Sequence, residues 1–364
     1  MQQQPASDAG DGLASRKSWW RRVEKTVGVL ASLSALILVG FTWKSITQVN
    51  SAQSIDREGI ITDRYMAAVE LLGNRESEEV RLGGLYGLQR VMYDSPRDQP
   101  TVINVVSTFI RARSPKESGR DAKTLAGDIT AALTVLKSRD SRHDGGVHVD
   151  LHDTGLYGAQ LGAMNLTGAD LTGADLGHAD LTAANLTGAN LTRALLDGAD
   201  LGHAKLTGAD LLQADLTDAD LPAANLSDAK LTSADLTDAL LMEANLTKAS
   251  LGEAKLPNAD FSHAEFVNVY VGDADLTGAD LSNANVDGTD LFFAKLTCTR
   301  LFGVDLKYIF INKEQLMSSG INADTTLPAD LADEPELKKQ ADKGAMPKGC
   351  PGRASDPPVK AVGS

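Results

Sequence analysis

Cysteine and aromatic residues are scarce in this chain of 364 residues. The two cysteines, Cys298 and Cys350, are too few for a disulfide framework, and neither stands in a CxxC pair or beside histidines at zinc-ligand spacing. Aromatic residues make up 5% of the chain although 42% is hydrophobic. The apolar content is therefore Leu, Ala, Val and Ile, which favours a core built from small repeated pieces.

The motifs that mark enzymes are also missing. The sequence contains no nucleophile elbow, no phosphate-cradling glycine loop and no carboxylate pair assignable to a cleft. His143, His148 and His152 stand near Asp150 and Asp153, but in no recognised ligand spacing. We therefore expect a protein that is not an enzyme and that holds no cofactor or metal.

Basic residues are few where acidic residues are concentrated. Residues 149–310 carry 24 acidic and 8 basic side chains, a formal charge of -16, whereas the whole chain carries -14. A sequence-independent grip on nucleic acid needs Lys and Arg to neutralise phosphates. A nucleic-acid partner is therefore not expected.

One long uncharged run lies near the N-terminus. Residues 27–43 read VGVLASLSALILVGFTW and would span about 26 Å as a helix, at the short end for a bilayer. Five basic residues precede the run and two come closely after it, which favours a cytoplasmic N-terminus. We predict a disordered basic tail over 1–25, a single transmembrane helix over 26–44 in the cell membrane, and an extracytoplasmic remainder. A cleaved signal peptide and a buried helix are the alternatives.

Residues 45–140 predict a small helical module. Apolar residues recur there at helical spacing, and Ser77 can cap a helix that begins with Glu78 and Glu79. The stretch 79–88 looks like one helix of a HEAT-type repeat. We expect four helices that act as a spacer and as a cap for the C-terminal half of the chain, with peptide binding as the alternative. The first predicted stripe consists of Ile61, Tyr65, Ala68, Val69 and Leu72.

A strict five-residue repeat occupies the C-terminal half. From Leu151 to Leu306 every fifth residue is apolar, which gives thirty-two repeats, and Ala usually stands two residues earlier, as in Ala169-Asp170-Leu171. Successive leucines would be rotated by about 140° on an α-helix and would alternate faces on a strand. Only a backbone that turns once per repeat sends them all to one interior. The spacing therefore predicts a solenoid.

These repeats resemble the pentapeptide-repeat family over about 160 residues. The resemblance implies a right-handed quadrilateral β-helix over 149–311, with four repeats per coil and with the central Leu or Phe and the preceding Ala pointing inward. Thirty-two repeats then make about eight coils, a rod roughly 38 Å long at about 4.8 Å per coil.

A twenty-residue coil sorts the residue before each central Leu into four outward columns. One column contains an acidic ridge, which is the candidate interaction surface; its alternative role is solubility and protection against association of coils. A second column is rich in Asn and is expected to form side-chain amide ladders. The ridge residues are Asp180, Asp200, Asp220, Asp260 and Asp280, and the column also holds Gln160, Leu240 and Arg300.

The C-terminal segment 312–364 is expected to close the solenoid. Residues 313–316 predict a short capping helix, and beyond Leu327 and Pro328 the polar composition predicts a flexible tail. Aromatic residues also gather in the last coils. If the rod is exported, a disulfide between Cys298 and Cys350 would tie the tail down.

Together these features predict a membrane-anchored scaffold. Its partners would be the lipid bilayer, through the N-terminal helix, and an unknown protein or cell-wall component, on the rod. The alternative is a DNA-mimicking regulator of an enzyme such as gyrase, because some quinolone-resistance members of the resembled family match duplex DNA in width and charge. The predicted anchor and topology favour the scaffold. The sequence does not predict an oligomeric state.

Overall fold

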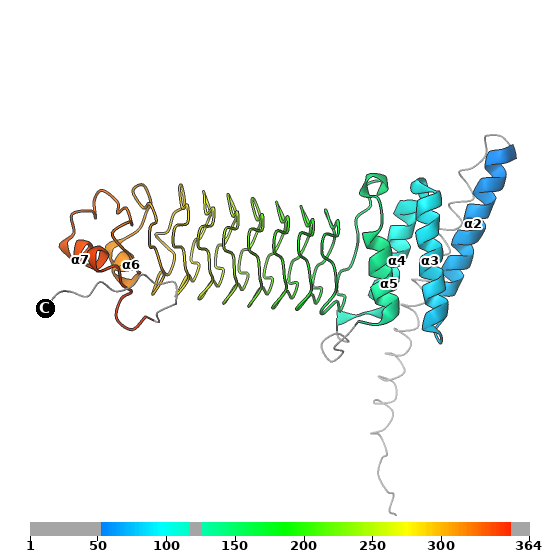
Figure 1. Ribbon diagram of the computed structural model, residues 1–364, viewed down its shortest axis with the longest axis horizontal. Helices are drawn as coiled ribbons and strands as arrows, with labels where there is room; N and C mark the ends of the chain where they lie inside the picture. The colour runs from blue at the N-terminus through cyan, green and yellow to red at the C-terminus, as the bar shows by residue number, and fades with distance from the viewer. Residues whose placement is uncertain (1–51, 117–124, 351–364) are drawn as a thin grey trace, which may run out of the picture. The chain divides into compact units, whose positions relative to one another are not determined.

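The computed structural model describes residues 52–116 and 125–350 (Figure 1). The chain divides into two compact units, Met1–Asp63 and Arg64–Ser364, and the solenoid belongs to the second. The predicted tail over 1–25 and the predicted transmembrane helix over 26–44 lie outside the described residues. None of the helices within the described ranges has the length and apolar character needed to cross a membrane.

The helical module contains the four expected helices: α2 (Ala52–Leu72), α3 (Glu78–Asp94), α4 (Gln99–Arg113) and α5 (Gly127–Lys137). Short 3-10 turns, η1 (Pro96–Asp98) and η3 (Ser141–His143), precede α4 and follow α5. The Ser77 hydroxyl accepts the Val80 N–H at 3.2 Å, so the predicted cap of α3 is confirmed. A Cβ on Gly87 would lie 2.9 Å from the Ala68 Cβ, so glycine there lets α3 approach α2 closely. In the predicted stripe, every residue except Val69 is buried.

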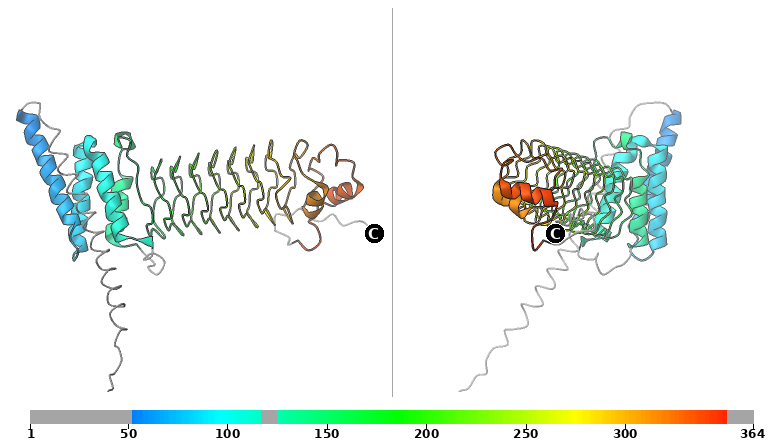
Figure 2. Two further views of the ribbon diagram at one scale, coloured as in Figure 1. Left: turned by 180° about the vertical axis from the view of Figure 1, so that it is seen from behind. Right: turned by 60° about the vertical axis from the view of Figure 1, so that its left-hand side comes forward.

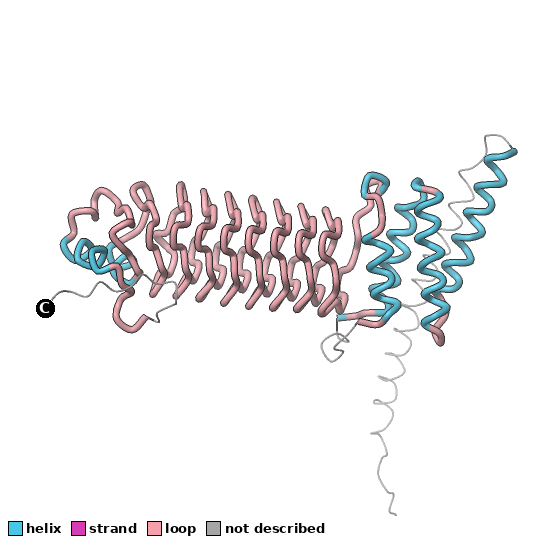
Figure 3. The backbone as a smooth tube through the Cα atoms, in the orientation of Figure 1, coloured by secondary structure: helices cyan, strands magenta, loops and turns pink. Residues whose placement is uncertain are grey.

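The solenoid has the twenty-residue coil that the repeat implies. Parallel bridges pair nearly every residue before a central Leu with the residue twenty positions later, from Asp150 and Asp170 to Asp290 and Phe310. In one such pair, the Leu161 N–H donates to the Asp180 carbonyl at 2.7 Å. Each bridge is a single residue pair rather than a long strand, so Figure 3 shows the coils as stacked loops.

The interior of the coils consists of the repeated apolar residues. All thirty-two central residues are at most 2% exposed, and the alanines two positions before them are at most 4% exposed. Burying one central side chain stabilises the fold by about 1.5–3 kcal/mol. Two larger residues, Phe261 and Phe266, meet edge to face with ring centroids 5.3 Å apart.

Each coil turns at four corners that require a left-handed backbone. The second residue after the central Leu has a positive φ in nearly every repeat, whether it is glycine, as Gly158 (68°), or not, as Ala163 (55°). Outside glycine this conformation costs roughly 1–2 kcal/mol per residue. The stacked hydrogen bonds and buried leucines offset that cost.

The helical module caps the first coil, as expected. The Arg111 guanidinium donates to the carbonyl of Asp150 at 3.0 Å, and the Arg139 guanidinium donates to the carbonyl of Asn165 at 2.6 Å. These carbonyls face the open end of the solenoid, where no earlier coil can pair with them. The module therefore satisfies backbone groups that would otherwise invite pairing with another chain.

The opposite end is closed by α6 (Lys313–Ser318), which confirms the predicted capping helix. Asn312 and Gln315 form a capping box at its start. The Gln315 side-chain amide donates to the carbonyls of Leu291, Phe292 and Ala294 at 2.7, 3.1 and 2.8 Å. One side chain thus serves three backbone acceptors of the last full coil.

Beyond Pro328 the structure differs from the predicted flexible tail, because it contains a further helix, α7 (Pro335–Lys343) (Figure 2). Leu337 of α7 is fully buried, and Lys313 forms ion pairs with Glu334 and Glu336 at 2.8 and 3.0 Å. The structure also joins Cys298 and Cys350 in the expected disulfide. One apolar anchor, two ion pairs and one crosslink hold a segment whose composition is otherwise polar.

Candidate interaction surfaces

The acidic ridge has the register that the twenty-residue coil predicts. Bridges join Asp180 to Asp200, Asp200 to Asp220, and Asp260 to Asp280. The exposure of these residues is uneven. Asp200 and Asp220 are exposed and Asp180 and Asp260 are half-buried, whereas Asp280 is only 3% exposed. The free part of the ridge is therefore its middle, and Asp280 does not belong to the surface that the sequence suggested.

Most ridge carboxylates also hold the backbone of the next corner. The Asp180 Oδ1 accepts the Thr182 N–H at 2.9 Å, and the Asp200 Oδ1 accepts the Gly202 N–H at 2.9 Å. Hydrogen bonds from the Thr182 side chain and backbone lower the pKa of Asp180. The same bond, from the residue before Leu to the N–H two positions later, recurs along the other columns. It explains why that position is most often Asp or Asn.

Asp220 departs from this pattern. Its corner position is occupied by Pro222, which has no N–H to donate. Next in register to Asp220 is Leu240, which is 39% exposed, and Met242 at the same corner is 40% exposed. The middle of the ridge therefore combines two exposed carboxylates with two exposed apolar side chains.

The Asn-rich column does not form the expected amide ladder. The Asn185 and Asn225 side-chain oxygens accept N–H groups of their own corners, at 3.2 and 3.1 Å. Among the described residues of this column, a side-chain bond between coils joins the Asn285 amide to the Glu265 carboxylate at 2.8 Å. The structural role is as expected, but the contact is local because the corner N–H lies closer than the next amide.

Lysines on the two remaining columns pair with acids one coil earlier. Such exposed pairs contribute about 0–1 kcal/mol each, but they neutralise local charge. The basic residue of the ridge column is Arg300, at its end beside Asp280, so the acids in the middle of the ridge are less compensated. The pairs are Lys230 with Asp210, Lys255 with Asp235, and Lys295 with Asp275, at 3.4, 3.3 and 3.1 Å.

The first two coils bring together three potential ligand residues, Asp150, His152 and Asp170, whose ligand atoms lie within 4.8 Å of one another. His152 Nδ1 lies 2.6 Å from the Asp150 Oδ1, and Arg111 forms an ion pair with the same carboxylate. The Arg111 charge disfavours a cation here. His143, His148 and Asp153 are not part of the group. Asp170 was not among the residues expected here, although the twenty-residue register places it beside Asp150.

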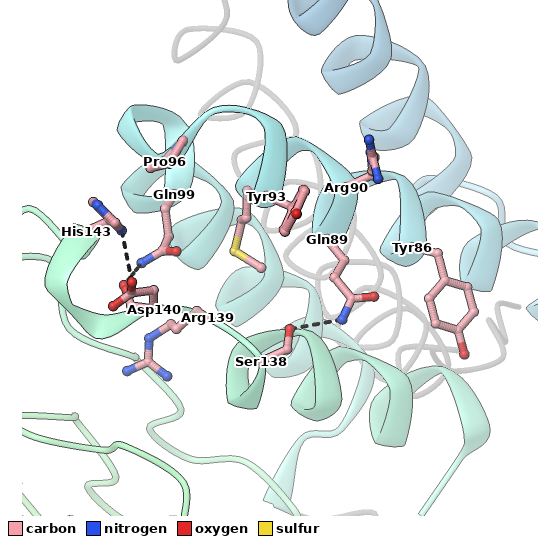
Figure 4. Close-up of a pocket in the computed structure, with 11 residues that line it drawn as sticks. Tyr86, Gln89, Arg90, Tyr93, Pro96, Gln99, Ser138, Arg139, Asp140 and His143 are labelled. Atoms are coloured by element: carbon pink, nitrogen blue, oxygen red, sulfur yellow. Dashed lines mark hydrogen bonds and ion pairs between the residues drawn. The ribbon is translucent and has the colours of Figure 1, made fainter.

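A groove of about 610 Å³ lies on the helical module, between α3 and the segment after α5 (Figure 4). Tyr86 and Tyr93, seven residues apart on one face of α3, line it and are 57% and 79% exposed. The Gln89 side chain donates to the Ser138 hydroxyl at 2.9 Å across the groove. This is where a peptide could bind, and the seven-residue spacing of the two tyrosines is the signal in the sequence that marks it.

The stacked coils, the buried Leu and Ala positions and the corner Asp and Asn define a β-helix-type solenoid of five-residue repeats. A family model described as pentapeptide repeats matches eight copies of its motif between residues 147 and 307. The chain belongs to the pentapeptide repeat family, and its N-terminal α-helical module is additional to the repeats.

Several solved structures are similar to this chain, among them the following three. HetL, a pentapeptide repeat protein involved in heterocyst differentiation regulation from Nostoc sp. strain PCC 7120, is 31% identical over 50% of this chain and 79% of its own, with a TM-score of 0.37. A pentapeptide repeat protein of the Arabidopsis thaliana thylakoid lumen is 32% identical over 30% of this chain and 69% of its own, with a TM-score of 0.14. Full-length QnrB1, a plasmid-mediated fluoroquinolone resistance protein, is 16% identical over 46% of this chain and 86% of its own, with a TM-score of 0.29. No curated protein matches the chain.

Proposed function

We propose that this protein is a non-enzymatic, membrane-anchored scaffold that binds a protein or cell-wall component on the side of its solenoid. The observation that carries the proposal is that residues of the chain itself cap both ends of the solenoid. Arg111 and Arg139 bond to carbonyls of the first coil, and Gln315 bonds to carbonyls of the last. The sides, with their patterned columns, are the surfaces left for partners.

The acidic ridge is the proposed binding face. Asp200 and Asp220 are exposed in its middle, and the backbone that carries them is fixed by hydrogen bonds to coils on both sides. A rigid surface loses little conformational entropy when a partner binds. A DNA-mimicking role is less well supported, because Leu240 interrupts the acidic row and Asp280 is buried.

Two features support an extracytoplasmic rod. The uncharged run over 27–43 comes after a cluster of basic residues, which favours a cytoplasmic N-terminus. The Cys298–Cys350 disulfide is a bond that persists in oxidising compartments and is rare in the cytosol.

Topology is tested by treating intact cells with an impermeant reductant and then an impermeant maleimide. Labelling of Cys298 and Cys350 without lysis is the expected result. Labelling only after lysis would reverse the topology and make a cytoplasmic partner the first to seek.

The ridge is tested by crosslinking in intact cells, comparing the native chain with Asp200→Asn/Asp220→Asn. The crosslinker must not react with carboxylates, so that the substitutions do not remove its reaction sites. Loss of a crosslinked product in this variant is expected. The control, Asp218→Asn/Asp228→Asn, removes two exposed corner carboxylates outside the ridge and should keep the product. Equal products from all three proteins would refute the ridge as the binding face.

A further inference from the structure

Five aromatic side chains lie exposed on the last coils of the solenoid. An aromatic ring side chain has about 150–250 Å² to bury, so five that are half to three-quarters exposed present on the order of 500–800 Å². Scattered exposed apolar residues are ordinary, whereas a patch above a few hundred Å² marks an interaction site. The aromatic patch consists of Tyr270, Phe292, Phe293, Tyr308 and Phe310, which are 63%, 48%, 67%, 76% and 72% exposed.

The coil register brings these rings together. Tyr270 is bridged to Asp290, which is bridged in turn to Phe310, so one column alternates aromatic, acidic and aromatic side chains. Phe292 and Phe293 come after Asp290 at the next corner, with ring centroids 5.1 Å apart. The patch therefore extends over three successive coils of rigid backbone.

Glycine makes room for the first ring of the patch. A Cβ on Gly252 would lie 2.7 Å from a ring carbon of Tyr270, and Gly272 is in equally close contact with that ring. Tyr270 therefore lies against the corner backbone of two coils, which fixes the ring while leaving its outer face open. A preorganised ring loses little entropy on binding.

Carboxylates surround the rings. Asp290 lies within the patch, Asp305 precedes Lys307 and Tyr308, and Asp273 stands one coil before Phe293 in the same corner column. These three carboxylates, and that of Asp287, are exposed. The basic residue within the patch is Lys307, whose ammonium lies 4.8 Å from the centroid of the Tyr308 ring. The patch thus already holds one cation over a ring and has an excess of negative charge.

We propose that the aromatic patch docks a basic segment of a partner protein. Arg or Lys side chains of the segment would lie over the exposed ring faces, and their charges would pair with Asp290 and the neighbouring carboxylates. Aromatic anchors inside a charged rim are the usual composition of a binding hot spot. The excess of carboxylates disfavours an anionic lipid surface. The proposal rests on the scaffold function but concerns a surface other than the acidic ridge.

The test uses the full chain in a non-ionic detergent and a fluorescein-labelled peptide of four Arg-Gly pairs, with fluorescence anisotropy as the readout. The expected result is binding that weakens about tenfold in Phe293→Ser/Phe310→Ser, because two exposed rings are removed. Asp290→Asn/Asp305→Asn should weaken binding and flatten its salt dependence. That variant is conservative, because an Asn oxygen can still accept the Phe292 and Lys307 N–H groups that these carboxylates accept at 2.9 and 3.0 Å.

The matched control is Asp218→Asn/Asp228→Asn, which removes the same charge from exposed corners outside both the acidic ridge and the aromatic patch and should leave the affinity unchanged. If that variant loses the peptide while the phenylalanine variant keeps it, the aromatic patch is not the docking site. Two further outcomes overturn the proposal. In the first, the native chain self-associates and the phenylalanine variant does not. In the second, the native chain binds phosphatidylglycerol vesicles and the phenylalanine variant does not. Because the protein is purified, the result does not depend on the membrane topology.

Discussion

Reducing the Cys298–Cys350 disulfide should loosen the C-terminal cap without unfolding the rod. The crosslinked cysteines are 52 residues apart and enclose the end of the last coil, α6 and α7. For a loop of that length the chain-entropy relation gives about 4 kcal/mol at 25 °C. This is an upper limit, because the cap can open while the neighbouring coils stay folded.

Hydrogen exchange measured by mass spectrometry provides the assay. About 4 kcal/mol changes the equilibrium constant for opening of the cap by a factor of about a thousand, so hydrogen exchange in α7 should accelerate by up to that factor on reduction. The relevant amides include Lys338 and Gly344, which donate within the helix at 3.1 and 3.0 Å to Glu334 and Ala341. The double variant Cys298→Ser/Cys350→Ser should behave like the reduced protein.

Peptides from the middle coils serve as the internal control, since the backbone of residues 181–220 is hydrogen-bonded to the neighbouring coils and should exchange equally in both states. Unchanged protection of α7 after verified reduction would refute the reasoning, because the buried Leu337 and the Lys313 ion pairs would then suffice to hold the cap. Uniform loss of protection along the rod would refute it differently, by showing that the cap and coils unfold as one.

Two further outcomes test the helical module. Asp128 is fully buried and forms ion pairs with Arg81, which is 4% exposed, and with a second arginine. Asp128→Ala should therefore lower the free energy of unfolding, measured in urea, by about 3–5 kcal/mol. Asp94 pairs with arginines that are more than half exposed, so Asp94→Ala should lower it by at most about 1 kcal/mol. Hydrogen bonds from the Arg142 side chain and backbone lower the pKa of Asp140 from 3.8 to about 2. The ion pair therefore stabilises the fold above about pH 4 and is lost as the pH falls towards 2. Carboxyl NMR titration should show this pKa, and in Arg142→Ala it should rise towards 3.8 without reaching it, because the variant keeps the backbone N–H that donates to Asp140.

The periodic part of the fold can be predicted from the sequence because its cause is local and repeated. A Leu at every fifth position fixes the interior, and the twenty-residue coil that the family resemblance implies then places Asp180 beside Asp200 and Lys230 beside Asp210. Four helices in the module and α6 are also readable, because capping residues and helical spacing mark them. These features need no knowledge of distant contacts.

Features that depend on distant segments were not predictable. Asp280 has the same local sequence as the exposed ridge residues, but it is bridged to Arg300, which is itself 1% exposed. The order of α7 rests on the buried Leu337, on the ion pairs of Lys313 and on a crosslink to a coil. The local role of the ridge acids was missed for another reason. A column shows which residues stack, but not that Asp180 bonds to its own corner.

The two caps restrict how the length of this rod can change. Each cap bonds to carbonyls at fixed positions of a coil: Arg139 reaches that of Asn165, and Gln315 reaches that of Leu291. Removing one repeat of five residues would rotate everything after it by a quarter turn, so the ridge and the aromatic patch would no longer face their original directions. Removing twenty residues would leave every direction intact and shorten the rod by about 4.8 Å. The length of the rod can therefore change only in steps of one coil if both surfaces are to keep their directions, and the number of coils sets the distance between its two ends.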